Sequence, residues 1–294
     1  MIALFRSVKN YFSLVKFSHT VFAMPFAMIG FSLAVSRDEN DFSIRLLLLI
    51  ILCMIFARNA AMSFNRLADR RFDALNPRTN NREIPRGIIA TGAATAFIVI
   101  NVILFIITTA FINRLTFSLS PVALLVILGY SLTKRITSLC HFILGLGLSL
   151  APIGAYISVT GRFSITPVIY SLIVLTWVSG FDIIYALQDD EFDKSNKLHS
   201  LPSVKGRKRA LAISVLVHFI TFILVLLAGY VGKGGLLFWS GAILFTILLI
   251  YQHLIVKHDD ISKVTLAFGT TNGIASILFA IFIIIDLVIR SQGA

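Results

Sequence analysis

The fold is decided most clearly by residues 210–256, ALAISVLVHFITFILVLLAGYVGKGGLLFWSGAILFTILLIYQHLIV, where Lys233 is the only charged residue. Two uninterrupted apolar stretches, 210–232 and 234–256, lie on either side of this lysine. Each exceeds the roughly 20 residues that a helix needs to cross the hydrocarbon core of a bilayer. The segment therefore predicts two successive transmembrane helices.

The rest of the chain repeats this pattern. Further stretches without a charged residue are 17–36, 87–113, 115–133, 136–161, 163–181 and 264–285, and the stretch 46–64 contains only Arg58. A continuous helix through Arg114 would be far longer than the apolar core of about 30 Å requires, so we expect a tight hairpin there. The sequence predicts an all-α, polytopic membrane bundle of nine transmembrane helices.

The composition supports a membrane protein and excludes other classes. Of the 294 residues, 57% are hydrophobic and only 14% are charged, and the mean hydropathy is +0.89. Soluble domains carry nearer a quarter charged residues, so an ordinary soluble fold, a disordered chain and a coiled coil are excluded. The net charge of +12 does not indicate a nucleic-acid partner, because a nucleic-acid-binding domain would not be this apolar. The expected partner is the lipid bilayer.

The cations indicate an orientation in the membrane. With a cytosolic N-terminus, 19 of the 26 Lys and Arg residues fall on the cytosolic side, six fall on the other side, and Arg58 lies within a helix. Cytosolic loops of membrane proteins are enriched in Lys and Arg. We therefore expect the N-terminus in the cytosol, and nine spans then place Ala294 outside.

The two longest cytosolic loops, 65–90 and 188–209, hold seven of the 14 acidic residues. The first opens with Asn65, Asp69 and Asp73, at i, i+4 and i+8. If the preceding helix continues, these three side chains line one face. Such a row of oxygen ligands suits a divalent cation, Mg²⁺ above all, that is shared with substrate phosphates.

The second loop repeats this spacing. Asp189 and Asp193 are again at i and i+4, while Asp182 and Tyr185 extend the same stripe toward the membrane interior. An acid at that depth is costly, so Asp182 is a candidate functional residue.

The doubling strengthens the interpretation, because one DxxxD pattern alone is a weak signal. Asp73 and Asp193 are 120 residues and four predicted helices apart, so both stripes face the same compartment. This arrangement predicts an internal duplication within a single domain, 1–294, of two four-helix units, about 1–135 and 136–256, with a ninth helix at 264–289. Two metal-binding stripes that face each other suggest a diphosphate site.

Cations follow both stripes. The candidate diphosphate ligands are Arg70, Arg78, Arg82 and Lys194. Arg contacts phosphate through its bidentate fork and Lys through a point charge. The basic cluster at 205–209 is better explained by topology and by contact with anionic lipid.

These motifs resemble those of a known family. Residues 65–87, NRLADRRFDALNPRTNNREIPRG, resemble the first signature of the UbiA family of membrane prenyltransferases, and residues 180–193, GFDIIYALQDDEFD, resemble the second. Supporting segments are KFSHT at 16–20 and YSLTKR at 130–135. Within the family, the sequences of these motifs are most similar to those of the 4-hydroxybenzoate polyprenyltransferases of quinone synthesis. The resemblance covers nearly the whole chain and implies a multi-pass enzyme of the bacterial inner membrane, with a cytoplasmic active site.

The resemblance also implies roles for individual residues. Mg²⁺ bound by Asp69, Asp73, Asp189 and Asp193, with Asn65 as ligand or positioner, would hold a polyprenyl diphosphate. Asp182 or Asp189 would polarise the phenol of an aromatic acid or take its proton, and Tyr185 would lie beside them. The acceptor's carboxylate would meet Arg58 first, or else Lys134 and Arg135.

Other interpretations remain open at this stage. Within the family, the acceptor could be a dihydroxynaphthoate, haem, a chlorophyllide or a glycerol phosphate. A transporter of anionic solutes would instead use Arg58, Asp182 and Asp286 along its pathway. A CDP-alcohol phosphotransferase also uses aspartates and Mg²⁺, but its Asp-Gly signature is missing here.

Overall fold

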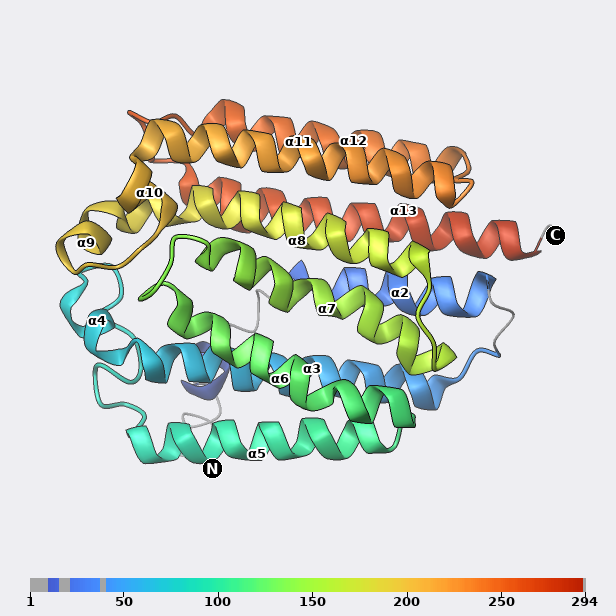
Figure 1. Cartoon of the computed structure of the whole chain (residues 1–294), viewed down its shortest axis with the longest axis horizontal. Helices are drawn as coiled ribbons and strands as arrows, with labels where there is room; N and C mark the ends of the chain where they lie inside the picture. The colour runs from blue at the N-terminus through green and yellow to red at the C-terminus, as the bar shows by residue number, and fades with distance from the viewer. Residues whose placement is uncertain (1–9, 16–21, 38–40, 293–294) are drawn as a thin grey trace.

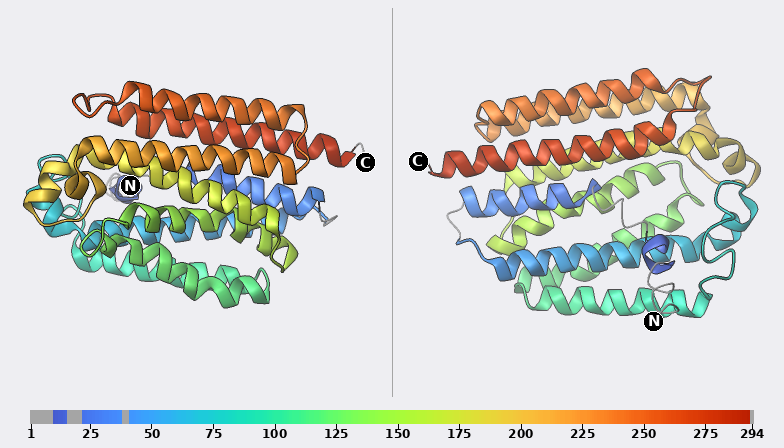
Figure 2. Two further views of the ribbon diagram at one scale, coloured as in Figure 1. Left: turned by 45° about the horizontal axis from the view of Figure 1, so that its top comes forward. Right: turned by 180° about the vertical axis from the view of Figure 1, so that it is seen from behind.

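The computed structural model describes residues 10–15, 22–37 and 41–292, and within these residues every regular element is helical. The long helices lie side by side along the long axis of the molecule, and several short helices gather at one end (Figure 1; Figure 2). The elements are α2 Met24–Arg37, α3 Ile44–Ala68, α4 Arg70–Leu75, α5 Thr91–Ala110, α6 Arg114–Thr133, α7 Cys140–Thr160, α8 Ile165–Tyr185, η2 Ala186–Asp189, α9 Asp190–Ser195, α10 Leu201–Lys205, α11 Arg207–Val231, α12 Leu236–Ile255, η3 Leu266–Thr271 and α13 Asn272–Gln292.

The all-helical membrane fold is confirmed. Eight helices within the described ranges are long and apolar enough to cross a membrane, and they match eight of the nine predicted stretches. The ninth stretch, 17–36, begins among residues outside the described ranges. Its described part forms α2, which at 14 residues is shorter than a full span.

The hairpin predicted at Arg114 is also confirmed. Helix α5 ends at Ala110 and α6 begins at Arg114. Asn113 caps α6 by accepting a hydrogen bond from the amide of Thr116, and it donates to the carbonyl oxygens of Ile157 and Ser158 at 2.8 and 3.0 Å. The turn is therefore attached to the end of α7, because one side chain satisfies backbone groups of both helices.

Small residues allow the central helices to approach closely. A Cβ atom on Gly30 of α2 would lie 2.0 Å from the carbonyl oxygen of Pro152 in α7, and one on Gly145 of α7 would lie 2.4 Å from that of Leu175 in α8. Close backbone contact is a common mode of helix packing in membranes. A buried aromatic cluster that contains Phe26, Trp177, Phe245 and Phe279 fills the space between α2, α8, α12 and α13.

The outer surface is apolar, as a lipid-facing surface must be. Large hydrophobic side chains are exposed on every membrane-length helix, among them Ile103, Leu125, Leu216, Ile247 and Ile289. In water these would form an unusually large apolar patch.

Both acid-rich loops lie at the same end of the bundle, as the even number of predicted helices between them requires. Figure 1 shows α4, α9 and α10 together at that end, whereas α13 ends at the opposite one. We call the former the loop end. The four-helix duplication itself stays a prediction.

Candidate active site

A cavity of about 680 Å³ extends along the inside of the bundle from the loop end. At the loop end it is polar and contains residues of both acidic stripes. Farther in, its lining is mainly apolar and reaches Ile157 in α7 and Phe163 in the turn after it. The predicted site residues that line this cavity are Arg58, Asn65, Asp69, Asp73, Arg78, Arg82, Lys134, Arg135, Asp182, Tyr185, Asp189 and Asp193.

The first stripe is positioned by the junction of α3 and α4. Although α3 ends at Ala68, the backbone continues its i to i−4 bonds, from Asp69 to Asn65 and from Asp73 to Asp69 at 2.9 and 2.8 Å. The spacing of four therefore keeps the three side chains on one face. The Asn65 amide also donates to Asp69 Oδ2 at 3.2 Å.

The second stripe begins in α8 and continues through the 3₁₀ turn η2 into α9. Asp182, Tyr185, Asp189 and Asp193 all reach the cavity. The neighbouring Asp190 does not, because it makes a bidentate ion pair with Arg207 at 2.6 and 2.8 Å.

The loop after the first stripe connects the two stripes. Arg78 donates two hydrogen bonds to the Asp189 carboxylate, from Nε to Oδ1 at 2.9 Å and from Nη2 to Oδ2. Its Nη1 donates to the Tyr185 hydroxyl at 3.0 Å, and Asn76 donates to Asp189 Oδ1 at 2.9 Å. The bidentate geometry makes this a strong contact between segments more than 100 residues apart.

Asp69, Asp73 and Asp193 also each have their own cation. Arg82 lies 2.6 Å from Asp73 Oδ1, and Arg135 lies 2.9 Å from Asp69 Oδ1. Lys134 Nζ lies 2.8 Å from Asp193 Oδ1. The short turn after α6 therefore supplies one cation to each stripe.

Burial raises the pKa values of both aspartates in the first stripe. It raises the pKa of the Asp73 carboxyl to about 6, although nearby Arg66 acts in the opposite direction. Burial also raises the pKa of Asp69 despite the contact with Arg135. In addition, Asp73 Oδ2 is buried and has no hydrogen-bond partner among the described residues. A cation that enters here would find a carboxylate oxygen to coordinate and would favour its charged form.

The donor set fits Mg²⁺ bound together with a substrate. Two aspartates of the first stripe and three of the second reach one cavity, and carboxylate oxygen is the ligand that Mg²⁺ prefers. Within the described ranges, no three His, Cys, Asp or Glu side chains gather closely enough to hold a metal alone. In phosphate enzymes, Mg²⁺ is usually held by one or two carboxylates together with substrate phosphates and water.

Two predicted diphosphate ligands lie elsewhere. Arg70 and Lys194 are not among the residues that line the cavity, and Arg70 donates instead to the Leu67 carbonyl at 2.8 Å. Each directly follows a stripe aspartate, Asp69 or Asp193. One residue along a helix turns the side chain by about 100°, which directs both cations away from the stripes.

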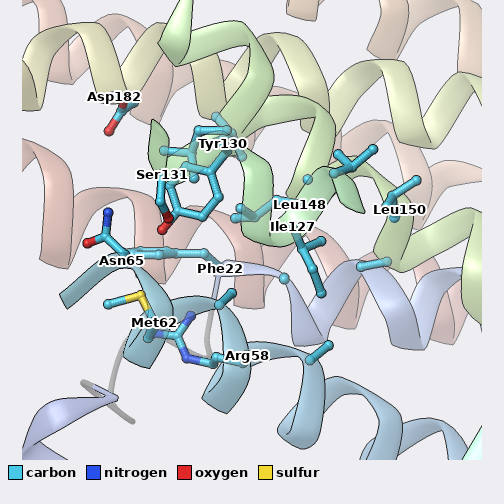
Figure 3. Close-up of a pocket in the computed structure, with 18 of the residues that line it drawn as sticks. Phe22, Arg58, Met62, Asn65, Ile127, Tyr130, Ser131, Leu148, Leu150 and Asp182 are labelled. Carbon is cyan, nitrogen blue, oxygen red and sulfur yellow. The ribbon is translucent and has the colours of Figure 1, made fainter. Parts of the chain in front are cut away.

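The three predicted acceptor cations are divided between two places. Lys134 and Arg135 are held by Asp193 and Asp69, as described above, and therefore belong to the aspartate end. Arg58 lies two turns deeper on α3, where its Nη2 is 3.5 Å from the Val15 carbonyl oxygen. Figure 3 shows Arg58 and Asn65 on α3 facing Tyr130 and Asp182 across the cavity.

The sequence interpretation missed several lining residues. Arg66 is only 3% exposed, and its Nε and Nη1 have no partner among the described residues. His141 lies 2.7 Å from Asp182, and Phe268 of η3 stacks on Tyr185 with ring centroids 4.0 Å apart. Arg66 follows Asn65 directly in the first motif, and this position could have identified it as a candidate site residue. His141 and Phe268 belong to apolar helices and carry no local signal.

Two further sequence expectations can be placed. Asp286, named for the transporter alternative, does not line the cavity. Its carboxylate accepts from the amides of Gly235 and Phe238 at the start of α12 and pairs with Arg290 at 3.2 Å, so its role is structural. The supporting segment at 16–20 lies outside the described residues, whereas Tyr130 lines the cavity.

Within the described residues, eight membrane-length helices surround a cavity that combines five aspartates with an apolar interior, the arrangement expected of an integral membrane enzyme for a phosphorylated lipid. The profile of the UbiA prenyltransferase family matches residues 23–283, so the chain belongs to this family and is a membrane prenyltransferase.

Individual relatives agree with this assignment. The 4-hydroxybenzoate octaprenyltransferase of Tolumonas auensis is 29% identical over 235 residues, which cover 80% of this chain and 82% of that one. Its counterpart in Aliivibrio fischeri (strain MJ11) is 27% identical over 233 residues, 79% and 81% of the two chains.

Solved structures agree as well. The apo UbiA homolog from Aeropyrum pernix K1 superposes with a TM-score of 0.79 at 27% identity and covers 92% of this chain and 98% of that one. The UbiA homolog from Archaeoglobus fulgidus bound to DMAPP and Mg²⁺ has a TM-score of 0.77 at 20% identity, covers 95% and 99%, and so shows a common fold.

Proposed function

We propose that this enzyme transfers a polyprenyl group from a polyprenyl diphosphate to an aromatic acid, 4-hydroxybenzoate, in a Mg²⁺-dependent reaction of quinone biosynthesis. The observation that carries the proposal is the cavity itself, which joins two cation-paired aspartate stripes to a long apolar interior. The names of the relatives support the acceptor, and the archaeal homolog bound to DMAPP and Mg²⁺ supports the donor and the metal.

The donor's diphosphate would bind at the loop end. Asp69 and Asp73 on one wall, with Asp189 and Asp193 on the other, would hold Mg²⁺, and Asn65 would position Asp69. When bound, the metal neutralises the charge that develops on the leaving diphosphate. Arg66, Arg78, Arg82, Lys134 and Arg135 add cations around the same space, so the leaving group is stabilised from several sides.

The prenyl chain would occupy the apolar part of the cavity. The lining there is mostly aliphatic and aromatic, and its hydroxyl groups, such as Ser120 and Ser158, donate to carbonyl oxygens of their own helices at 2.8 and 2.7 Å. Few polar groups therefore remain to hold water beside the reacting allylic carbon. Exclusion of water protects an electrophilic carbon from conversion to an alcohol.

The acceptor ring would lie between the donor and Asp182. Arg58 would hold the acid's carboxylate. The C–O bond of the donor breaks, and its electron pair leaves with the diphosphate. A ring carbon ortho to the hydroxyl then uses a π electron pair to form the new C–C bond. Its proton passes to the Asp182 carboxylate, which restores the aromatic ring.

The contacts of Asp182 and Asp189 suggest different roles for the two aspartates. Arg78 occupies both oxygens of Asp189 in a bidentate ion pair, which lowers the proton affinity of that carboxylate. Asp182 contacts His141 through its Oδ2 atom. We therefore assign the proton acceptor to Asp182 and the binding of diphosphate to Asp189.

The first test uses purified enzyme in nanodiscs with a labelled polyprenyl diphosphate and 4-hydroxybenzoate. We expect prenylated acid to form with Mg²⁺ and to fall to background with EDTA, with recovery when Mg²⁺ is restored. The double variant Asp69→Ala plus Asp189→Ala should lose at least about 100-fold in kcat/KM, because it removes a ligand from each stripe. Glu191→Ala is the matched control, since Glu191 is 90% exposed.

A panel of acceptors with the same donor identifies the substrate. Preferential turnover of a dihydroxynaphthoate would replace 4-hydroxybenzoate in the proposal. Undiminished activity of the double aspartate variant would contradict the metal assignment.

A further inference from the structure

His141 is a buried histidine at the start of α7 whose two ring nitrogens are both engaged. Its Nδ1 lies 2.7 Å from Asp182 Oδ2, and its Nε2 lies 3.2 Å from the backbone nitrogen of Leu201. The His141 side chain is only 2% exposed, whereas that of Asp182 is 20% exposed. Both residues line the cavity, and the histidine is the more deeply buried of the two.

The contact with Leu201 determines the tautomer. A backbone amide can only donate, so Nε2 of His141 is the acceptor and carries no hydrogen. Nδ1 then carries the ring hydrogen and donates it to Asp182 Oδ2. This leaves Asp182 Oδ1 as the oxygen available to a ligand, and Figure 3 shows Asp182 facing the space opposite Asn65. The hydrogen bond thus selects which oxygen faces the reactants.

The spacing of α7 and α8 holds this pair in place. One turn from His141, a Cβ on Gly145 would lie 2.4 Å from the Leu175 carbonyl oxygen, so only glycine permits the close approach of the two helices. Ser179 donates to the carbonyl oxygen of His141 at 3.2 Å, one turn before Asp182. Both contacts limit sliding of His141 relative to Asp182.

A second connection joins this pair to the metal-binding end. Ser200 is the N-cap of α10, and its hydroxyl donates to Asp193 Oδ2 at 2.7 Å. The next residue, Leu201, donates its amide to His141. Two adjacent residues therefore hold both an aspartate of the second stripe and the histidine that contacts Asp182.

We propose that His141 is a positioning residue for proton transfer, because it orients Asp182 with one oxygen toward the ring proton of the acceptor. The inference rests on the proposed role of Asp182 as proton acceptor. In this role His141 acts through the orientation of Asp182 and not on the acceptor itself.

The test uses two amide substitutions of similar size. The Asn side chain places an N–H donor near the position of His Nδ1, and the Gln side chain places its amide near His Nε2. We expect His141→Asn to keep kcat within about threefold, because the donor to Asp182 is retained. His141→Gln should lower kcat by about 10- to 100-fold, the usual value of a hydrogen bond to a charged group. The KM for the prenyl diphosphate should be unchanged in both.

An isotope effect separates positioning from a loss of structure. The acceptor carries deuterium on the ring carbon that is prenylated. In His141→Gln the slower proton removal should become rate-limiting, so the primary isotope effect on kcat should rise. It should stay near that of the parent enzyme in His141→Asn. If His141→Gln does not fold, as judged by thermal unfolding in nanodiscs, His141→Met supplies a donor-free side chain of similar volume.

His141→Asn keeps the donor to Asp182, whereas His141→Gln and His141→Met lack it. Equal kcat values and equal isotope effects in these variants would overturn the inference. Asp182→Asn separates this failure from that of the proposed function. If Asp182→Asn keeps its turnover, the assignment of Asp182 as proton acceptor is wrong. If Asp182→Asn is inactive while the His141 variants are indistinguishable, only the positioning role of His141 is wrong.

Discussion

At the residue scale, Arg66 and Arg70 show that proximity to a motif in the sequence does not determine whether a side chain lines the cavity. Both lie within one turn of Asp69, and both are arginines. Arg66 lines the cavity, where two of its buried nitrogens have no partner among the described residues, whereas Arg70 does not line it and donates to the Leu67 carbonyl at the end of α3. A spacing of four residues on one helix would leave the two side chains only about 40° apart, so the helical period alone does not separate them. They belong to different helices, Arg66 to α3 and Arg70 to α4.

We expect Arg66→Met to lower kcat/KM for the prenyl diphosphate by about 10- to 100-fold, because a charge-assisted contact with phosphate is lost. Arg70→Met, the matched control, should stay within about threefold. Steady-state kinetics with varied donor and saturating acceptor measure both. Equal losses in the two variants would contradict the placement of Arg66 at the diphosphate.

The residue scale also marks the limit of sequence reasoning about the site. The i, i+4 pattern located Asn65, Asp69, Asp73, Asp189 and Asp193, because a helical face is a local property. The partners of these aspartates were not predicted. Contacts such as Lys134 with Asp193 depend on how separate helices face each other, and no periodicity within one helix specifies that.

At the scale of the element, α7 contributes lining residues to both ends of the cavity. His141 lies at its loop end, and Gly154 lies 13 residues farther, about 20 Å along the axis at 1.5 Å per residue. Gly154 lines the cavity, and a Cβ added there would meet nothing within 4 Å. A larger side chain at this position would therefore project into the space proposed for the prenyl chain.

The substitution Gly154→Leu should shorten the usable cavity. We expect kcat/KM for a long polyprenyl diphosphate to fall by at least about tenfold, while a two-isoprene donor keeps most of its activity, because only the long chain reaches this depth. Gly129→Leu on α6 is the control, since Gly129 does not line the cavity and a Cβ there also meets nothing. Parallel losses for long and short donors would contradict this position of the chain.

At the scale of the whole molecule, the uneven distribution of cations predicts that the loop end faces the cytosol. Nineteen of 26 Lys and Arg residues fall on that side of the predicted topology. The long apolar surface of the bundle fixes its axis across the bilayer, so the two ends must face different compartments.

Labelling of single cysteines tests this orientation. In a background with Cys53 and Cys140 replaced by alanine, Ser195→Cys marks the loop end and Arg162→Cys the opposite end, and both positions are exposed. A membrane-impermeant maleimide should label position 195 in inverted vesicles and position 162 in intact spheroplasts. The reverse pattern would show that the loop end faces outward.

The sequence by itself determined the membrane helices, the two aspartate stripes and the family resemblance, because hydrophobic length and helical periodicity are properties of a continuous segment. The tertiary structure decided which residues meet. It brought Arg78 to Asp189, placed Lys134 and Arg135 at opposite stripes, and set His141 beside Asp182. These contacts follow from the packing and rotation of helices that are distant in the chain, which are set by complementary surfaces between elements and not by the pattern within one of them.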